Sequence, residues 1–138
     1  MSEDQNLNNG EVIAFITCDD VYVDPATGKH SLLGIFTNLR GRSFPVRHPK
    51  MIWYVSLGEV PQGTHNFKIY FGVIPSEEPP KLIIDKEITS EGAHKKINMI
   101  NEIKDLVIEE PNSYSIIIEV DEDVLFVDTF DVQQVDDE

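Results

Sequence analysis

Cysteine is almost absent from this chain, and long apolar runs are missing altogether. Cys18 is the only cysteine among 138 residues, so no disulfide can form within the chain. A chain without disulfides fits a reducing compartment, and we expect a cytoplasmic protein. No apolar run approaches the roughly 20 residues of a membrane-spanning helix, and none resembles the core of a secretory signal peptide.

Motifs for catalysis and for phosphate binding are missing as well. The chain contains neither G-x-S-x-G nor the glycine-rich patterns G-x-x-x-x-G-K-S/T and G-x-G-x-x-G. Its histidines lie without the spacing of a zinc site, at His30, His48, His65 and His94. The sequence therefore predicts a protein that is not an enzyme and that has no cofactor.

Positive charge is scarce and confined to one region. The chain has 25 acidic and 11 basic residues, which gives a net charge of −14. Such a surface repels nucleic acid and anionic membranes, so neither is expected as a partner. Residues 29–50 are the exception, because they contain no acid and five basic residues: Lys29, Arg40, Arg42, Arg47 and Lys50. Residues 105–138 contain twelve acids and neither lysine nor arginine.

The basic segment at residues 40–50 is the best candidate for a partner-binding surface. Arginine beside an aromatic residue on a loop suits a carboxylate, a phosphate or a partner protein. The predicted contact residues are Arg40, Arg42, Phe44, Arg47 and Lys50. In the alternative interpretation, Phe44 fills the core and the arginines pair with the acidic C-terminal hairpin of the same chain.

Alternating apolar residues and turn signals run through most of the chain. Strands are predicted at 12–23, 29–36, 51–57, 67–73, 82–88, 114–120 and 124–132, while Pro45 and Pro49 predict an irregular segment at 38–50. The segment 24–28 has the composition of a hairpin loop. About eight or nine short strands are typical of a β-sandwich. We therefore predict a single-domain antiparallel β-sandwich over residues 11–135, with a disordered polar and acidic tail at 1–10 and an acidic tail at 136–138.

One segment, residues 93–107, fits two patterns. Ile97, Ile100 and Val107 approximate a helical stripe, whereas Ile97, Met99 and Ile103 approximate one face of a strand. The β-branched residues and the all-β context favour a strand, with a helix as the alternative.

Two acidic groups are the candidates for a calcium site. Asp19, Asp20 and Asp24 accompany the first predicted hairpin, and Asp121 and Asp123 lie in a later turn. Calcium takes several carboxylate oxygens, which two loops at one end of a sandwich can supply. Because EF-hand spacing is missing, we predict no metal, with solvated or turn-capping aspartates as the leading interpretation.

Cys18 is a poor candidate for a nucleophile. The adjacent Asp19 and Asp20 disfavour the thiolate, because nearby carboxylates raise the pKa of a thiol. We expect Cys18 to be a small buried residue on the first strand.

Several short motifs occur in a familiar order: C-D-D at 18–20, L-L-G-I-F at 32–36, S-F-P at 43–45 and E-P-N-S-Y at 110–114. This series resembles a family of short bacterial all-β proteins that is classed as a domain of unknown function. The resemblance spans residues 12–134. It implies the β-sandwich and a strand at residues 95–103, and it carries over no catalytic residues.

The complete strand pattern and the segregated charge together predict a non-catalytic interaction or assembly module. It would act through protein contacts, with a partner protein or with copies of itself. Two alternatives stay open at this point: a structural subunit of a phage or secretion particle, and a calcium- or small-ligand-binding domain.

Overall fold

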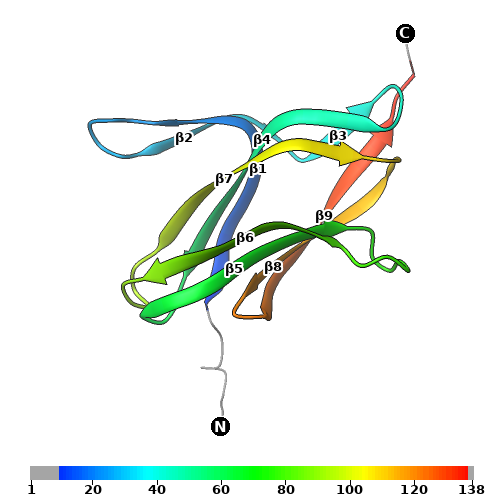
Figure 1. Ribbon diagram of the computed structural model, residues 1–138. Helices are drawn as coiled ribbons and strands as arrows, with labels where there is room; N and C mark the ends of the chain where they lie inside the picture. Colours follow the sequence, from blue (N-terminus) through cyan, green and yellow to red (C-terminus); the bar gives the residue numbers. More distant parts are fainter. Residues whose placement is uncertain (1–9, 137–138) are drawn as a thin grey trace.

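Nine strands form two sheets that face each other across one apolar core (Figure 1). The computed structural model describes residues 10–136. The strands are β1 (Glu11–Val23), β2 (His30–Phe36), β3 (Asn38–Gly41), β4 (Val46–Gly58), β5 (Gly63–Gly72), β6 (Lys81–Ser90), β7 (Ile97–Ile108), β8 (Asn112–Val120) and β9 (Asp123–Gln134). The described residues contain no helix, and hence none long and apolar enough to cross a membrane. The predicted all-β sandwich is confirmed.

The first sheet has the order β2-β1-β4-β7, and the second has the order β3-β9-β8-β5-β6. One pair departs from the predicted antiparallel arrangement, because β3 runs parallel to β9 with Asn38 opposite Asp131. Only Thr37 separates β2 from β3, so the chain passes from the first sheet to the second at this residue.

The basic segment is more regular than predicted. Residues 38–41 form β3, and β4 begins at Val46 although Pro49 lies within it. Proline has no N–H to donate to a neighbouring strand. However, β1 pairs with β4 only from Ile52 onward, so Pro49 has a strand neighbour on one side alone. Proline is tolerated at such positions, and the prediction of an irregular segment at 38–50 is wrong for β3 and the start of β4.

The segment with two possible patterns, residues 93–107, is a strand from Ile97 onward, as its β-branched residues favoured, whereas residues 93–96 form a turn before it. β7 pairs with β4 along its length, from Leu57 opposite Ile97 to Val46 opposite Ile108. The core between the sheets is built by alternate residues of the central strands, among them Met51, Trp53, Val55 and Leu57 of β4 and Phe67, Ile69 and Phe71 of β5.

Residues 1–9 and 137–138, which hold most of the two predicted tails, lie outside the described residues. Gly10, which the sequence pattern places in the N-terminal tail, is buried. A Cβ atom on Gly10 would lie 2.7 Å from Cγ2 of Val60, a core residue. The packed domain therefore includes residue 10.

Candidate functional site

The hairpin formed by β1 and β2 extends beyond the other strands of the first sheet (Figure 1). Asp24 caps the turn at its tip. The Asp24 carboxylate accepts hydrogen bonds from the Ala26 N–H at 3.1 Å and from the Thr27 hydroxyl at 2.9 Å. Gly28 follows with a φ of +75°, which suits glycine. The hairpin loop predicted at 24–28 is present.

The hairpin bends where Asp19 of β1 meets Gly34 of β2. Gly34 has a φ of +71°, and the Asp19 carboxylate lies so close that its Cγ would be 2.9 Å from a Cβ on Gly34. Beyond this point, His30 Nδ1 lies 3.0 Å from the Tyr54 hydroxyl of β4. In the strand registers, His30 is opposite Val23 of β1 and Tyr54 is opposite Ile16 of β1. Seven positions along β1 would separate them by roughly 23 Å in a flat sheet. The hairpin therefore folds back toward β4.

The bent hairpin presents apolar side chains to solvent along an open sheet edge. Tyr22, Leu33 and Ile35 are 54%, 50% and 60% exposed. β2 is the last strand of its sheet, so one of its edges has no strand partner among the described residues. Natural proteins protect such edges with charge, proline or a covering segment. Residues 31–36 contain neither a charged residue nor a proline, so this edge lacks two of these protections.

The first half of the basic segment lies beside β9. Arg40 is opposite Gln133 in the β3–β9 pair. The main-chain carbonyl of Arg42 accepts a hydrogen bond from the side-chain amide of Gln134 at 3.0 Å. Phe44 is partly buried against the core, as in the alternative interpretation of this segment.

The second half of the basic segment lies on β4 and forms ion pairs across the first sheet. Arg47 lies 3.8 Å from Asp105 of β7, and Lys50 lies 3.2 Å from Asp20 of β1 and 3.9 Å from Glu102 of β7. These partners belong to β1 and β7, whereas the alternative interpretation placed them in the C-terminal hairpin. The side chains of these pairs are exposed, and ion pairs in such positions contribute little to stability. Partner binding by these basic residues stays a prediction.

The two acidic groups are not brought together. Asp19 and Asp20 lie in β1 and Asp24 in the turn after it, whereas Asp121 and Asp123 belong to the β8–β9 hairpin of the second sheet. The two hairpins lie well apart in Figure 1. In the part of the chain that the structure describes, no group of three His, Cys, Asp or Glu side chains is placed to hold a metal ion.

Cys18 is buried, as predicted. Its Sγ lies 3.3 Å from the carbonyl oxygen of Asp20. Burial raises the pKa of the Cys18 thiol, and the charges of Asp19 and Asp20 act in the same direction. The thiol is therefore a packing group at neutral pH.

A polar contact that the sequence pattern did not indicate joins His65 to Asp121. His65 Nδ1 lies 2.6 Å from the Asp121 carboxylate, and Nε2 lies 2.7 Å from the carbonyl of Pro61. Because both ring nitrogens face acceptors, the protonated imidazolium satisfies both. Burial by itself lowers the pKa of His65, but the hydrogen bonds to Asp121 and Pro61 outweigh it and raise this pKa. Hydrogen bonds from His65 and the Asn66 N–H lower the pKa of Asp121.

This contact predicts a pH-dependent stability. Because the folded pKa of His65 is raised, its contribution is complete below the ordinary histidine pKa of about 6.5 and is lost as pH rises through the raised value. Because the pKa of Asp121 is lowered, its contribution is complete above about 3.9 and is lost as pH falls through the lowered value. Urea unfolding of the wild type should therefore show a loss of stability as the pH rises above about 6.5, and Asp121→Asn should lack this loss. Equal slopes in the two proteins would contradict this assignment.

Comparison with known proteins assigns a family. Residues 13–133 match the family of unknown function DUF6941. The chain belongs to this family. The resemblance to an uncharacterised domain family, inferred from the hairpin motifs, is thereby confirmed, and the contact between Asp19 and Gly34 shows how the C-D-D and L-L-G-I-F motifs of this DUF6941 chain meet in space.

No curated protein matches this DUF6941 chain. Among solved structures, a β-glucosidase from Kluyveromyces marxianus is similar over 71% of this chain, with 17% sequence identity and a TM-score of 0.48. The match covers 15% of the β-glucosidase chain.

Proposed function

We propose that this DUF6941 protein is an assembly module that joins copies of itself by pairing the free edges of strand β2. The observation that carries this proposal is the open β2 edge with its exposed apolar residues, Leu33 and Ile35. Adding a strand to an exposed sheet edge is a common mode of protein recognition, in which main-chain hydrogen bonds supply affinity and side chains supply specificity.

Charge favours a second copy at this edge over contact elsewhere. With a net charge of −14, two copies repel each other in most orientations. The other long end strands contain acids, Asp85 and Glu87 in β6 and Glu102 and Asp105 in β7. Residues 30–36 contain none. Two β2 strands can therefore approach without bringing acids of β2 face to face.

Symmetry then determines the form of the assembly. A strand that pairs antiparallel with its own copy uses the same patch on both chains, and such a contact closes into a dimer. Leu33 and Ile35 flank Gly34 on β2, and both are exposed. Across the two-fold axis, each of these side chains would pack against apolar side chains of the other copy. Their apolar surface would thereby be removed from water, which favours association.

Sedimentation equilibrium tests this proposal. We expect a wild-type dimer, and we expect Leu33→Lys combined with Ile35→Lys to weaken dimerisation at least tenfold, or about 1.4 kcal/mol. The matched control is Val127→Lys on β9, an equally exposed valine at 58%, which should leave the dimer intact. A wild type that stays monomeric up to about millimolar concentration, or a double lysine variant that dimerises as tightly as the wild type, would refute the proposal.

The effect of salt on association distinguishes this assembly from a head-to-tail contact between the basic segment and the acidic C-terminal region. Added salt screens the repulsion between two acidic chains, so pairing through β2 should strengthen or hold as ionic strength rises. A contact between opposite charges would weaken under the same conditions.

A further inference from the structure

Two apolar residues on the outer face of the first sheet are fully buried, although the second sheet packs against the opposite face. Cys18 of β1 and Ile52 of β4 lie opposite each other, and they are 0% and 2% exposed. The adjoining pair, Thr17 and Trp53, points the other way, and Trp53 belongs to the core between the sheets. A segment other than the second sheet therefore covers Cys18 and Ile52.

The end of the β1–β2 hairpin beyond its bend is this cover. It contacts β4 on either side of Ile52. The Asp20 carboxylate lies 3.2 Å from Lys50 Nζ. His30 Nδ1 lies 3.0 Å from the Tyr54 hydroxyl, and the two rings meet edge to face. Lys50 and Tyr54 are each two positions from Ile52 and share its face of the strand, so the hairpin passes over Ile52.

Side chains alone hold this end of the hairpin to the sheet. β1 pairs with β4 only as far as Cys18, and among residues 10–136 the main chain of residues 20–23 pairs with residues 30–33 only. Leu32, two positions from His30, turns to the same side and is half-buried. Segments held by so few contacts open at a lower free energy than the whole domain unfolds.

We propose that the β1–β2 hairpin is a lid on the outer face of the first sheet. It opens as a unit about the bend at Asp19 and Gly34, where Gly34 has a positive φ, while both sheets stay folded. The closed lid conceals the thiol of Cys18 and the side chain of Ile52, and the open lid presents both to solvent. Because the lid moves within one chain, it does not depend on the pairing of β2 edges.

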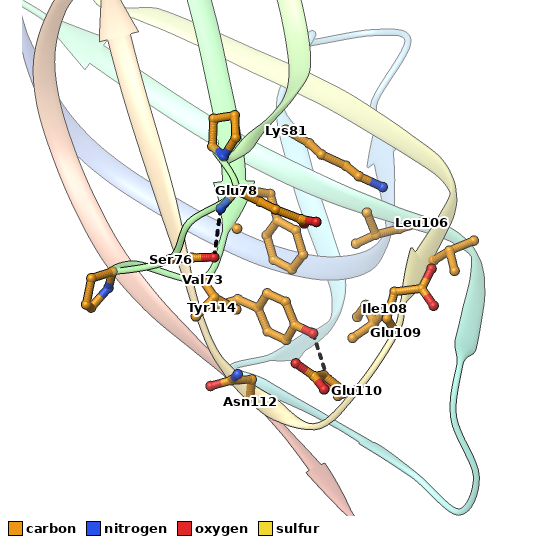
Figure 2. A pocket seen from close by; sticks show the side chains of 15 residues that line it. Val73, Ser76, Glu78, Lys81, Leu106, Ile108, Glu109, Glu110, Asn112 and Tyr114 are labelled. Carbon is orange, nitrogen blue, oxygen red and sulfur yellow. Dashed lines mark hydrogen bonds between the residues drawn. The ribbon is translucent and has the colours of Figure 1, made fainter.

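The 73–80 loop covers a different kind of surface. It lines a cavity of about 260 Å³ together with the end of β7 and the start of β8 (Figure 2). Phe71 and Tyr114 line the same cavity, stack on each other and belong to the core between the sheets. Displacing this loop would therefore uncover the core itself, whereas displacing the lid uncovers only an outer face.

Labelling of the native full chain with the thiol reagent DTNB measures lid opening, because Cys18 is the only thiol. We expect the wild type to react more slowly than free cysteine and faster than its free energy of global unfolding allows. At urea concentrations below the unfolding transition, the rate should form a plateau, since opening the lid exposes little surface. A reaction that needs global unfolding would instead accelerate steeply with urea.

Two variants should loosen the closed lid and raise this plateau. Tyr54→Phe removes the hydroxyl that contacts His30, and we expect labelling about three- to tenfold faster. Leu32→Ala removes apolar contacts beneath the lid and should accelerate labelling at least as much. The matched controls are Tyr70→Phe, at a half-buried tyrosine of β5, and Ser31→Ala, at an exposed position of the lid. Both controls should leave the plateau unchanged.

Three outcomes would overturn the lid. They are a rate that follows global unfolding from zero urea, a plateau that neither variant raises, and labelling of the wild type as fast as that of free cysteine. The measurement is made at low and at high protein concentration. The rate in dilute, monomeric protein reports the lid alone, so the fate of the lid is separated from that of β2 pairing.

Discussion

Replacing Trp53 with alanine is expected to destabilise the domain by roughly 3–5 kcal/mol, the range for removing a buried tryptophan side chain. Trp53 is 1% exposed. Its ring centroid lies 6.1 Å from that of Phe15 in the first sheet and 5.9 Å from that of Phe71 in the second. The indole therefore packs against aromatic rings of both sheets. Because domains are typically stable by about 5–15 kcal/mol, its loss removes a large part of the total.

Urea unfolding followed by far-ultraviolet circular dichroism measures this change. Fluorescence is unsuitable, because Trp53 is the only tryptophan. Trp53→Phe keeps an aromatic ring in the core and should lose much less, so it stays measurable even if the alanine variant does not fold. Tyr54→Ala, at the next and only half-buried position, provides the matched control and should also lose less. An alanine variant within about 1 kcal/mol of the wild type would contradict the central role of Trp53.

Replacing Gly34 with alanine is expected to destabilise the domain by about 2–4 kcal/mol and to disturb the hairpin bend. A side chain at positive φ costs about 1–2 kcal/mol. In addition, the new Cβ would lie 2.9 Å from Cγ and 3.1 Å from Cβ of Asp19, so rotation of the carboxylate alone does not relieve the contact. Because the bend presents the β2 edge, we expect this variant to dimerise less well too.

A matched control separates the two causes. Gly28 has a similar φ of +75°, but a Cβ there meets no atom within 4 Å. Gly28→Ala should therefore show the conformational cost without the clash. Asp19→Gly should rescue part of the loss in the Gly34→Ala background, as a double-mutant cycle would reveal. Equal effects of the two glycine substitutions would show that the Asp19 contact is unimportant.

The strand alternation was readable from sequence because it reflects local geometry. Successive side chains of a strand point to opposite faces, so Met51, Trp53 and Val55 identify a buried face without knowledge of any neighbour. Prediction fails where two strands shift against each other. The alternation places Val124 on the same face of β9 as the buried residue Phe130. However, a bulge shifts the register of β8 and β9 between Ile118 and Glu119, and Val124 is 56% exposed.

The candidate surfaces were harder to predict because they combine distant residues. The contact between His65 and Asp121 joins residues 56 positions apart. The basic segment looked like an irregular exposed loop, but pairing with β7 and β9 made most of it strand. The lid likewise depends on His30 and Tyr54, which lie 24 positions apart. No local pattern encodes such neighbours.

The sequence by itself therefore determined the all-β class, the hairpin turn at residues 24–28, the burial of Cys18 and the excess of negative charge. Each depends on composition or on the period of a single strand. Only the tertiary structure decided which edges stay open, how Asp19 and Gly34 bend the hairpin, and which segment covers Cys18 and Ile52. These features depend on the packing of strands and hairpins, which brings together residues that are far apart in the chain.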